Sequence, residues 1–169
     1  MKIWFLTKIL IIIGIIAIAF FSSNVVNAAS CQGSSCYGYD PNTMGCGSDA
    51  ATHRYKTITY GRMDLRYSDI CFAEWERTYN SSGSNKYGEG SIRWGDIDYS
   101  SGWFTVSSPG SFSSGSSVYT AMYAISYSYY PTYPASLSCG SLSTGGPIFP
   151  PAQPINLQSP YGQNNCRAW

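Results

Sequence analysis

Apolar and polar residues alternate along much of the chain with a period of two, which is typical of β-strands with one buried face. The pattern predicts strands over residues 55–60, 63–68, 91–99, 103–107 and 118–129. The last of these alternates most clearly, with one face formed by Tyr119, Ala121, Tyr123, Ile125, Tyr127 and Tyr129. β-branched and aromatic side chains, which favour strands, are frequent in these segments.

Two segments depart from this alternation. Residues 71–79 fit a short helix, because Phe72, Trp75, Glu76 and Tyr79 fall on one helical stripe. After Pro131 the chain is rich in Pro, Gly and Ser, which predicts irregular structure. The expected fold is therefore mostly β: a small disulfide-stabilised β-sandwich or barrel with one short helix and an irregular C-terminal tail.

The N-terminus has the three-part pattern of a secretory signal peptide. Lys2 and Lys8 precede or flank an apolar run over residues 9–21, and Val26-Asn27-Ala28 supplies small residues at a cleavage site. Thirteen apolar residues are short for a transmembrane anchor, which needs about 20. We expect residues 1–28 to be removed and the protein to be secreted and extracellular. The alternatives are retention as an anchor, or a lipoprotein modified at Cys31.

Six cysteines follow this cleavage site and predict disulfide bonds in an oxidising compartment: Cys31, Cys36, Cys46, Cys71, Cys139 and Cys166. Six cysteines allow fifteen pairings. We expect the first four to pair among themselves and the last two to pair with each other. The expected organisation is a disulfide-stabilised β domain over residues 29–139 and a tail over residues 140–169 that Cys166 ties down.

Charge does not favour a polyanionic partner. Without residues 1–28 the chain keeps eight basic residues against nine acidic ones. Nucleic acid and anionic membrane surfaces are therefore not expected to be partners, and no membrane span is expected after cleavage of the signal.

Catalytic residues are scarce. A Ser-His-Asp site needs a histidine, and His53 is the only one in the chain. Two carboxylate pairs, Glu74 with Glu76 and Asp96 with Asp98, could share a strand face and hydrolyse a glycan. Alternating charges are more commonly the solvent side of a strand. We therefore assign no catalytic residue and expect no enzyme.

No metal or cofactor is predicted. The segment from Asp40 begins like a calcium loop, but Met44 and Ala51 occupy positions five and twelve, where oxygen ligands are needed. An Asx turn at Asp40 is the structural interpretation. Zinc at Cys31 and Cys36 is disfavoured by the oxidising compartment.

Aromatic residues are the remaining functional signal. They could form a stacking platform for sugars, and the candidates are Trp94, Trp103, Tyr119, Tyr123 and Tyr127. The alternative is that the tyrosine stripe is the inner face of a sheet. Arg66 is expected to pair with a nearby acid, Asp64 or Asp69. The sequence thus predicts a secreted non-enzymatic protein with a cell-surface, cell-wall or glycan partner. The alternatives are a small secreted hydrolase that uses carboxylates, or an antibacterial or inhibitory protein.

Several short motifs resemble the YjfA-like family of uncharacterised secreted bacterial proteins. The shared pattern consists of Cys31 and Cys36, Asp40-Pro41, Gly45-Cys46, Leu65-Arg66-Tyr67-Ser68, Cys71 and Trp75. Residues 119–122 and Cys139 resemble the closing strand and last cysteine of that family. Glu76 stands where the family usually has Ala, and residues 140–169 have no counterpart. The resemblance implies a bacterial extracytoplasmic protein and carries no activity with it.

Overall fold

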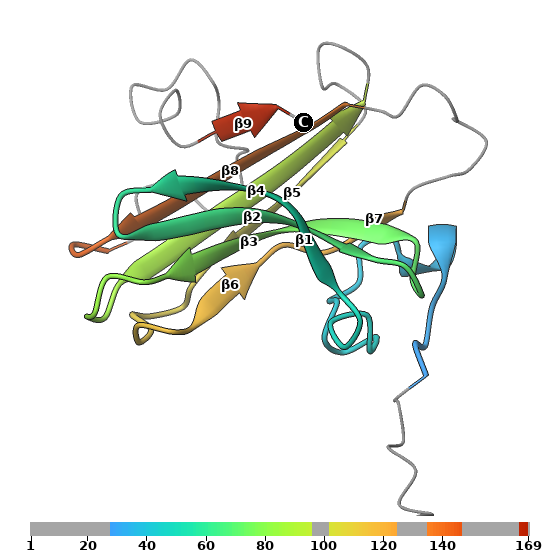
Figure 1. Ribbon diagram of the computed structural model, residues 1–169, viewed down its shortest axis with the longest axis horizontal. Coiled ribbons are helices and arrows are strands. Elements are labelled where there is room, and N and C mark those ends of the chain that lie inside the picture. Colours follow the sequence, from blue (N-terminus) through green and yellow to red (C-terminus); the bar gives the residue numbers. More distant parts are fainter. Residues whose placement is uncertain (1–27, 96–101, 125–134, 147–165, 169) are drawn as a thin grey trace, which may run out of the picture.

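The protein is a sandwich of two antiparallel sheets, seen in a computed structural model that describes residues 28–95, 102–124, 135–146 and 166–168 (Figure 1). The strands are β1 (Ala51–Ile58), β2 (Gly61–Ser68), β3 (Ala73–Asn80), β4 (Tyr87–Gly95), β5 (Gly102–Ser107), β6 (Ser117–Tyr119), β7 (Tyr123–Ala124), β8 (Ala135–Ser143) and β9 (Cys166–Ala168). The first sheet has the order β1-β2-β3-β6, with β7 also paired to β3, and the second has the order β5-β4-β8-β9. Within the described residues this confirms a mostly β fold and a sandwich rather than a barrel.

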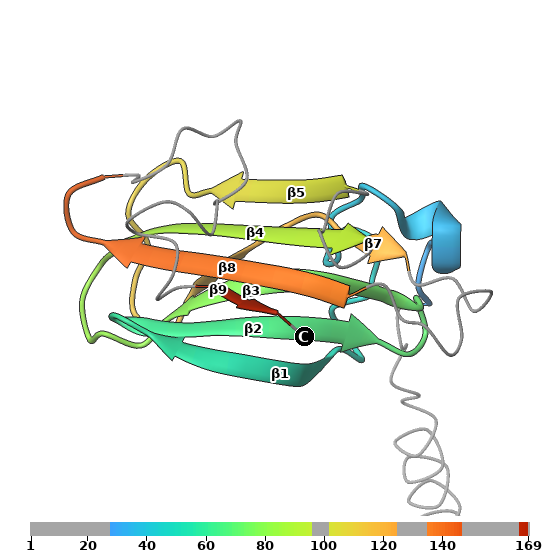
Figure 2. The ribbon, with the colours of Figure 1, turned by 90° about the horizontal axis from the view of Figure 1, so that it is seen from above.

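The strands of both sheets run along the same long direction (Figure 2). Consecutive strands β1, β2 and β3 pair as a meander, and β4 pairs with β5 as a hairpin. The predicted strands over residues 55–60, 63–68, 91–99 and 103–107 therefore exist with shifted ends, and residues 96–99 lie outside the described residues. Tyr60 lies between β1 and β2 with φ of 71°, a left-handed conformation that the tight turn requires.

The predicted helix over residues 71–79 is wrong, because this segment forms most of strand β3. β3 lies in the middle of its sheet and is covered on both faces: Trp75 packs under the disulfide-rich N-terminal segment, while Glu76 and Thr78 face the second sheet. A strand that is buried on both faces shows no clean alternation of apolar and polar residues. Its side chains therefore also fitted a helical stripe.

The predicted strand over residues 118–129 is only partly correct. Its described part is split into β6 and β7. Between them the Thr120 N–H still donates to the Glu76 carbonyl oxygen over 3.0 Å, while Met122 donates to the Tyr39 carbonyl oxygen and leaves the ladder. Residues 125–129 lie outside the described residues.

Irregular structure was predicted after Pro131, and this is wrong for β8 and β9. β8 occupies a central position in the second sheet and pairs with β4 along its whole length. Its sequence, Ala-Ser-Leu-Ser-Cys-Gly-Ser-Leu-Ser, has the composition of a loop. Small residues suit this strand because its inward face meets large side chains from the opposite sheet, and Gly140 lies against Thr78 and Glu76.

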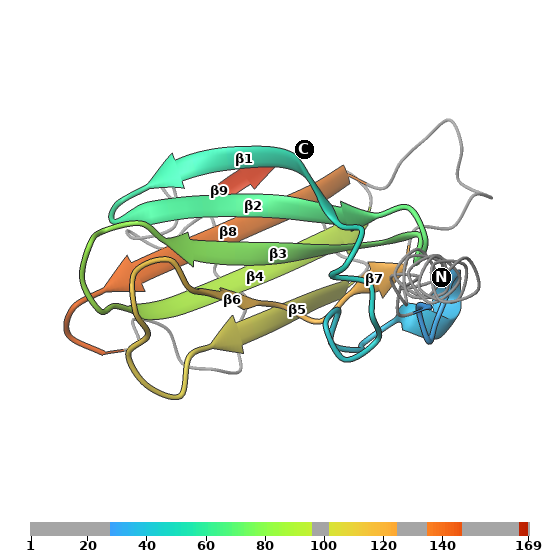
Figure 3. The ribbon, with the colours of Figure 1, turned by 60° about the horizontal axis from the view of Figure 1, so that its bottom comes forward.

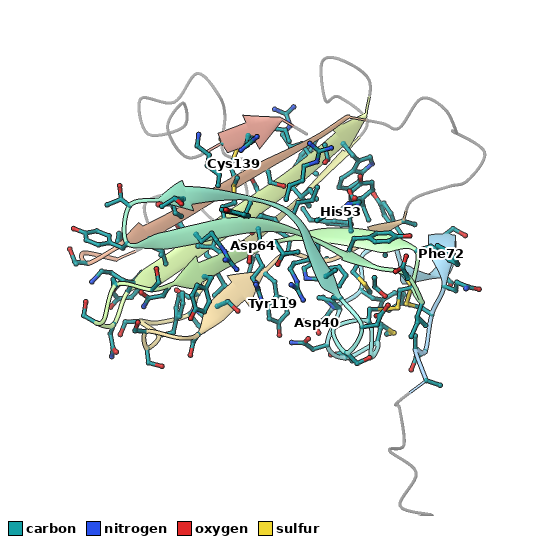
Figure 4. All side chains as sticks on the ribbon, in the orientation of Figure 1. Asp40, His53, Asp64, Phe72, Tyr119 and Cys139 are labelled. Carbon is teal, nitrogen blue, oxygen red and sulfur yellow. A yellow bond between two sulfur atoms is a disulfide. The ribbon has the colours of Figure 1, made fainter. Side chains whose placement is uncertain are left out.

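Three disulfides join the cysteines as expected: Cys31–Cys36, Cys46–Cys71 and Cys139–Cys166. The first two belong to the N-terminal segment, which contains a short 3₁₀ helix, η1 (Gly33–Cys36). Together with Ala73, Trp75 and Met122 they form a buried cluster at one end of the first sheet. The third ties β9 to β8, and Figure 4 labels Cys139 beside β9.

In the part of the chain that the structure describes, no helix is long and apolar enough to cross a membrane. The predicted signal peptide lies outside the described residues except for Ala28.

Candidate functional site

The first sheet carries an unusual polar surface on the side that points away from the second sheet. Met63 and Leu65 of β2 pack inward against Leu142 and Ile92. Because side chains alternate along a strand, the even-numbered residues of β2 point outward. We call this surface the arginine–tyrosine face, and it consists of Tyr55, Arg62, Arg66, Arg77, Tyr79 and Tyr119 around Asp64. Figure 3 shows the sheet from this side.

Strand register brings these residues together from four strands. Asp64 of β2 lies opposite Tyr55 of β1 and Arg77 of β3. Arg77 in turn lies opposite Tyr119 of β6. A single row across the sheet therefore places one carboxylate and one guanidinium between two tyrosines. Figure 4 labels Asp64 and Tyr119, the second and last members of this row.

Asp64 is fully buried at the centre of this face, beneath two arginines. Arg77 Nε donates to Oδ2 over 3.0 Å, and a second donor, Arg77 Nη2, reaches the same oxygen. Arg62 Nη2 donates to Oδ2 over 3.1 Å, and Arg62 Nε lies 2.6 Å from Oδ1 as an ion pair without hydrogen-bond alignment. Two cations therefore neutralise one buried carboxylate and leave an excess positive charge.

Arg66 does not pair with Asp64 or Asp69 in the way that the sequence suggested. Its guanidinium donates to Thr52 Oγ1 over 2.7 Å and to the Ala50 carbonyl oxygen. The pKa of Arg66 is lowered, first by burial and then by the positive charge of Arg77. Arg66 is thus a cation fixed by neutral oxygens beside other cations, because the nearby carboxylate is already bonded to Arg62 and Arg77.

Tyrosine rings lie beside these guanidinium groups. Arg62 Cζ is 5.3 Å from the ring centre of Tyr55 and 5.9 Å from that of Tyr79, within the range of cation–π contacts. The Tyr119 hydroxyl accepts a hydrogen bond of 2.7 Å from Asn42 Nδ2. Tyr55 is 56% exposed and offers a ring face to solvent. The face therefore presents fixed charge and aromatic surface together.

The aromatic platform predicted from the sequence does not form among the described residues. Trp94 and Tyr123 are buried and stack on each other between the two sheets, with ring centres 5.1 Å apart and planes 3° apart. Trp103 is 50% exposed on the edge strand β5, and Tyr119 belongs to the opposite sheet. Tyr127 lies outside the described residues. Tyr123 is thus part of the core, as the alternative interpretation of the stripe expected, whereas Tyr119 lies on the outer face opposite Arg77.

Glu74 forms a second polar group at the inner side of β3. Its carboxylate accepts a 2.7 Å hydrogen bond from the Tyr123 hydroxyl, and His53 Nδ1 lies 3.6 Å from it. Burial raises the pKa of Glu74, against the opposing effects of the Tyr123 hydrogen bond and His53. Burial, and then the charge of Glu74, raises the pKa of Tyr123. His53 is exposed and stacks on Tyr67 with ring centres 5.3 Å apart.

Glu76 points into the core between the sheets. Thr78 Oγ1 donates to its Oε1 over 2.6 Å, while Oε2 has no hydrogen-bond partner among the described residues. A Cβ on Gly90 would lie 1.8 Å from Oε2, so the glycine makes the space that this carboxyl occupies. Burial raises the pKa of Glu76 well above its usual range. Because residues 73–80 form a strand and not the predicted helix, Glu74 and Glu76 share a face of β3. Asp96 and Asp98 lie outside the described residues.

Two possible metal sites have other structural roles. The four sulfurs of Cys31, Cys36, Cys46 and Cys71 lie within 4.8 Å of one another, but they form two disulfides and offer no thiolate ligand. Asp40 Oδ1 accepts the Thr43 N–H over 2.8 Å, three residues on and not two as in an Asx turn, so Asp40 holds a local turn of a related type.

Sequence reasoning missed the arginine–tyrosine face as a site. Its signal was present as the alternation of Arg62, Asp64 and Arg66 along β2, with Arg77 and Tyr79 on the next strand. The contribution of β3 could not be found while that segment was predicted as a helix.

Comparison with known proteins gives one match. A family described as "Protein of unknown function (DUF2690)" matches residues 34–129. The match covers most of η1 and all of β1 to β7, and it therefore includes the whole arginine–tyrosine face. No curated protein and no solved structure matches the chain.

Proposed function

The chain belongs to the DUF2690 family of proteins of unknown function, and we propose that it is a secreted, non-enzymatic protein that binds a cell-surface partner, in the cell wall or on a glycan. The observation that carries this proposal is the arginine–tyrosine face. Three guanidinium groups and exposed tyrosine surface gather there on a sheet whose opposite side is closed by the second sheet.

Secretion is supported by the sequence of residues 1–28 and is compatible with three disulfides and no free cysteine among the described residues. The resemblance to the YjfA-like secreted bacterial proteins points the same way. We propose that the mature protein begins at Ala29 and remains outside the cell.

The arginine–tyrosine face suits binding better than catalysis. Its carboxylate, Asp64, is fully buried and engaged by Arg62 and Arg77, so it is not available to accept a proton from a substrate. Arginine and tyrosine are enriched at binding surfaces because they combine hydrogen bonding with large contact area. Their contacts with each other and with Thr52 hold several side chains in place before a ligand arrives.

The test is sedimentation of the disulfide-bonded mature protein with purified cell-wall fragments. Tyr55→Ser and Arg66→Gln should each weaken binding by about tenfold, a typical loss for one good interface residue. Trp103→Ser is the matched control, since it removes an exposed aromatic ring from the other sheet. Binding that is lost only in Trp103→Ser would place the site elsewhere, and wild-type protein that stays in the supernatant would refute the proposal.

A hydrolase is the second candidate, favoured by Glu74. A buried acid with a raised pKa beside a histidine is a common feature of catalytic sites. Release of soluble fragments from cell wall by the wild type, abolished in Glu74→Gln, would support hydrolysis over simple binding. His53→Gln should then reduce turnover as well.

A further inference from the structure

We infer that the ligand of the arginine–tyrosine face is a polyanion, specifically a flexible polymer with repeated phosphate groups on a sugar or polyol backbone. This inference rests on the proposed function and adds the chemical class of the ligand. Whole-chain charge gave no hint of it, because the acidic and basic residues nearly balance.

The local charge on this face is positive. Arg62, Arg66 and Arg77 contribute three guanidinium groups, and Asp64 contributes the carboxylate that they surround. Among these four residues the excess is therefore two positive charges, and the next carboxylate, Asp49, lies at the end of β2, where it accepts from Ser68 Oγ. The pKa of Arg66 is lowered, first by burial and then by the charge of Arg77, with the charge of Asp64 opposing and that of Arg62 adding to the effect. An anion on this face would relieve that repulsion.

The spacing of the cations fits a repeated anion better than a single small one. Arg62 and Arg66 are four residues apart on β2, which corresponds to about 13 Å along a strand. Arg77 lies on the neighbouring strand opposite Asp64, at a position between them. The guanidinium groups are held on different partners, Arg62 on Asp64 and Arg66 on Thr52, so successive groups of a polymer can engage them in turn.

Phosphate also fits the donors. Guanidinium groups present paired N–H donors that match phosphate oxygens, and arginine is favoured wherever planar recognition of phosphate matters. Arg62 and Arg77 keep partly exposed side chains, at 40% and 24%, although both contact Asp64. They can therefore hold a ligand while they neutralise the carboxylate beneath it.

The tyrosines favour a sugar or polyol backbone over nucleic acid. Single-stranded nucleic acids are bound by several aromatic rings on which successive bases stack. On this face Tyr55 is mostly exposed, whereas Tyr79 and Tyr119 are half-buried, one beside arginines and the other bonded to Asn42. One exposed ring suits an isolated sugar contact. It does not provide a track for bases.

The test uses inorganic polyphosphate as the probe and measures its affinity for the mature protein at several salt concentrations. The logarithm of the association constant should fall with the logarithm of salt concentration with a slope of about −2, as expected for about three ionic contacts with a flexible chain. Orthophosphate at the same total phosphorus should not compete. Arg66→Gln should weaken binding at least about fivefold and make the slope shallower by about 0.7, the share of one contact.

Arg54→Gln is the matched control, because it removes one positive charge from an exposed position of β1 that is opposite Leu65 rather than an outward residue. It should leave the affinity for polyphosphate unchanged. Equal losses in Arg54→Gln and Arg66→Gln would show attraction to net charge alone and overturn the inference. Thermal melts of both variants confirm that they remain folded.

The outcomes separate this inference from the proposed function. Binding to wall fragments that is insensitive to salt, without binding to polyphosphate, overturns the polyanion and leaves the cell-surface role standing. If the protein binds neither wall fragments nor polyphosphate, both the inference and the proposed function are overturned. Tighter binding to single-stranded DNA than to polyphosphate also overturns the inference, in favour of nucleic acid.

Discussion

Two acidic residues on neighbouring strands, Asp64 and Glu76, are both fully buried, and their surroundings are opposite. Asp64 lies on the outer side of the first sheet, where Arg62 and Arg77 surround its carboxylate. Glu76 lies one register position away on the inner side, where Thr78 is the one side chain of the described residues that donates to its carboxyl group. The same sheet thus buries one acid as a paired charge and the other where burial favours the neutral form.

The difference shows what decides the state of a buried acid. Burial is equal for the two side chains, so desolvation alone does not separate them. What differs is the presence of fixed cations, which offset the cost of burying a charge. Asp64 therefore organises a charged surface, while Glu76 fills a notch that Gly90 provides in the core. The first residue belongs to the proposed binding face and the second to packing.

The largest loss of stability is expected for Asp64→Asn. This change keeps the size of the side chain but removes the charge that holds two partly buried arginines together. We expect a loss of about 3–5 kcal/mol in the free energy of unfolding, which is typical of removing one partner of a buried ion pair. Urea denaturation of the mature protein at neutral pH measures it.

Asp40→Asn is the matched control for that experiment. Asp40 accepts one backbone N–H in an exposed turn, and asparagine keeps an oxygen in the same place. Its effect should stay within about 0.5 kcal/mol. If Asp64→Asn is equally mild, the two arginines do not depend on the carboxylate, and the proposed contrast with Glu76 fails.

The next largest effect is expected at Gly90. Gly90→Ala would place a methyl group 1.8 Å from Glu76 Oε2 in a packed core. The loss should be about 1–3 kcal/mol, as for other overpacked sites. The double variant Gly90→Ala with Glu76→Ala should recover part of this loss, since shortening Glu76 removes the clash. A double-mutant cycle by urea denaturation gives the coupling energy between positions 90 and 76. Strictly additive losses would contradict the claim that Gly90 makes the space for Glu76.

Much of the sandwich was predictable because the strands of its hairpins show the alternation of apolar and polar residues that is typical of strands. β1, β2 and β5 alternate visibly, and the pairing of Cys139 with Cys166 was expected. β8 was not predictable, since a strand made largely of Ser and Gly has the composition of a loop. Its strand character comes from pairing with β4, which is a long-range contact that no local pattern contains.

The candidate site was less predictable than the fold. The position of Arg77 beside Asp64 depends on the register between β2 and β3, and the sequence does not contain that register explicitly. The net charge of the chain sums the outward arginines with acidic residues elsewhere, so it gives no sign of a local positive surface. Trp94 was assigned to a binding platform because the alternation along its strand does not show which face is exposed. The structure places its ring in the core, stacked on Tyr123.

A smaller effect is expected in the pH dependence of the free energy of unfolding, to which Glu76 contributes and Asp64 serves as the contrast. Its pKa is raised in the folded protein, so the folded state keeps the proton where the unfolded chain has lost it. This contribution to stability is full below the ordinary pKa of 4.5 and is lost as the pH rises through the folded-state pKa. Relative to Glu76→Gln, the wild type should therefore lose stability with rising pH, by at most about 1.4 kcal/mol per pH unit.

Urea denaturation of both proteins from pH 4 to 8 measures the difference. Glu74, whose pKa is also raised, is present in both proteins, so its contribution cancels. A difference that stays flat over this range, or that grows in favour of the wild type, would mean that Glu76 is ionised in the fold.

The smallest expected effect is at another buried acid, Glu74, which is intermediate between the two extremes. It has one buried hydrogen bond, from Tyr123, and an exposed basic neighbour, His53, at 3.6 Å, while Arg54 contributes a weaker attraction. Because 59% of the His53 side chain is exposed, water screens its interaction with the carboxylate. His53→Ala should therefore change the free energy of unfolding by less than about 0.5 kcal/mol. Tyr123→Phe should cost about 1 kcal/mol or more, since it removes the buried donor. If the histidine variant has the larger effect in urea denaturation, Glu74 resembles Asp64 and depends on a cation.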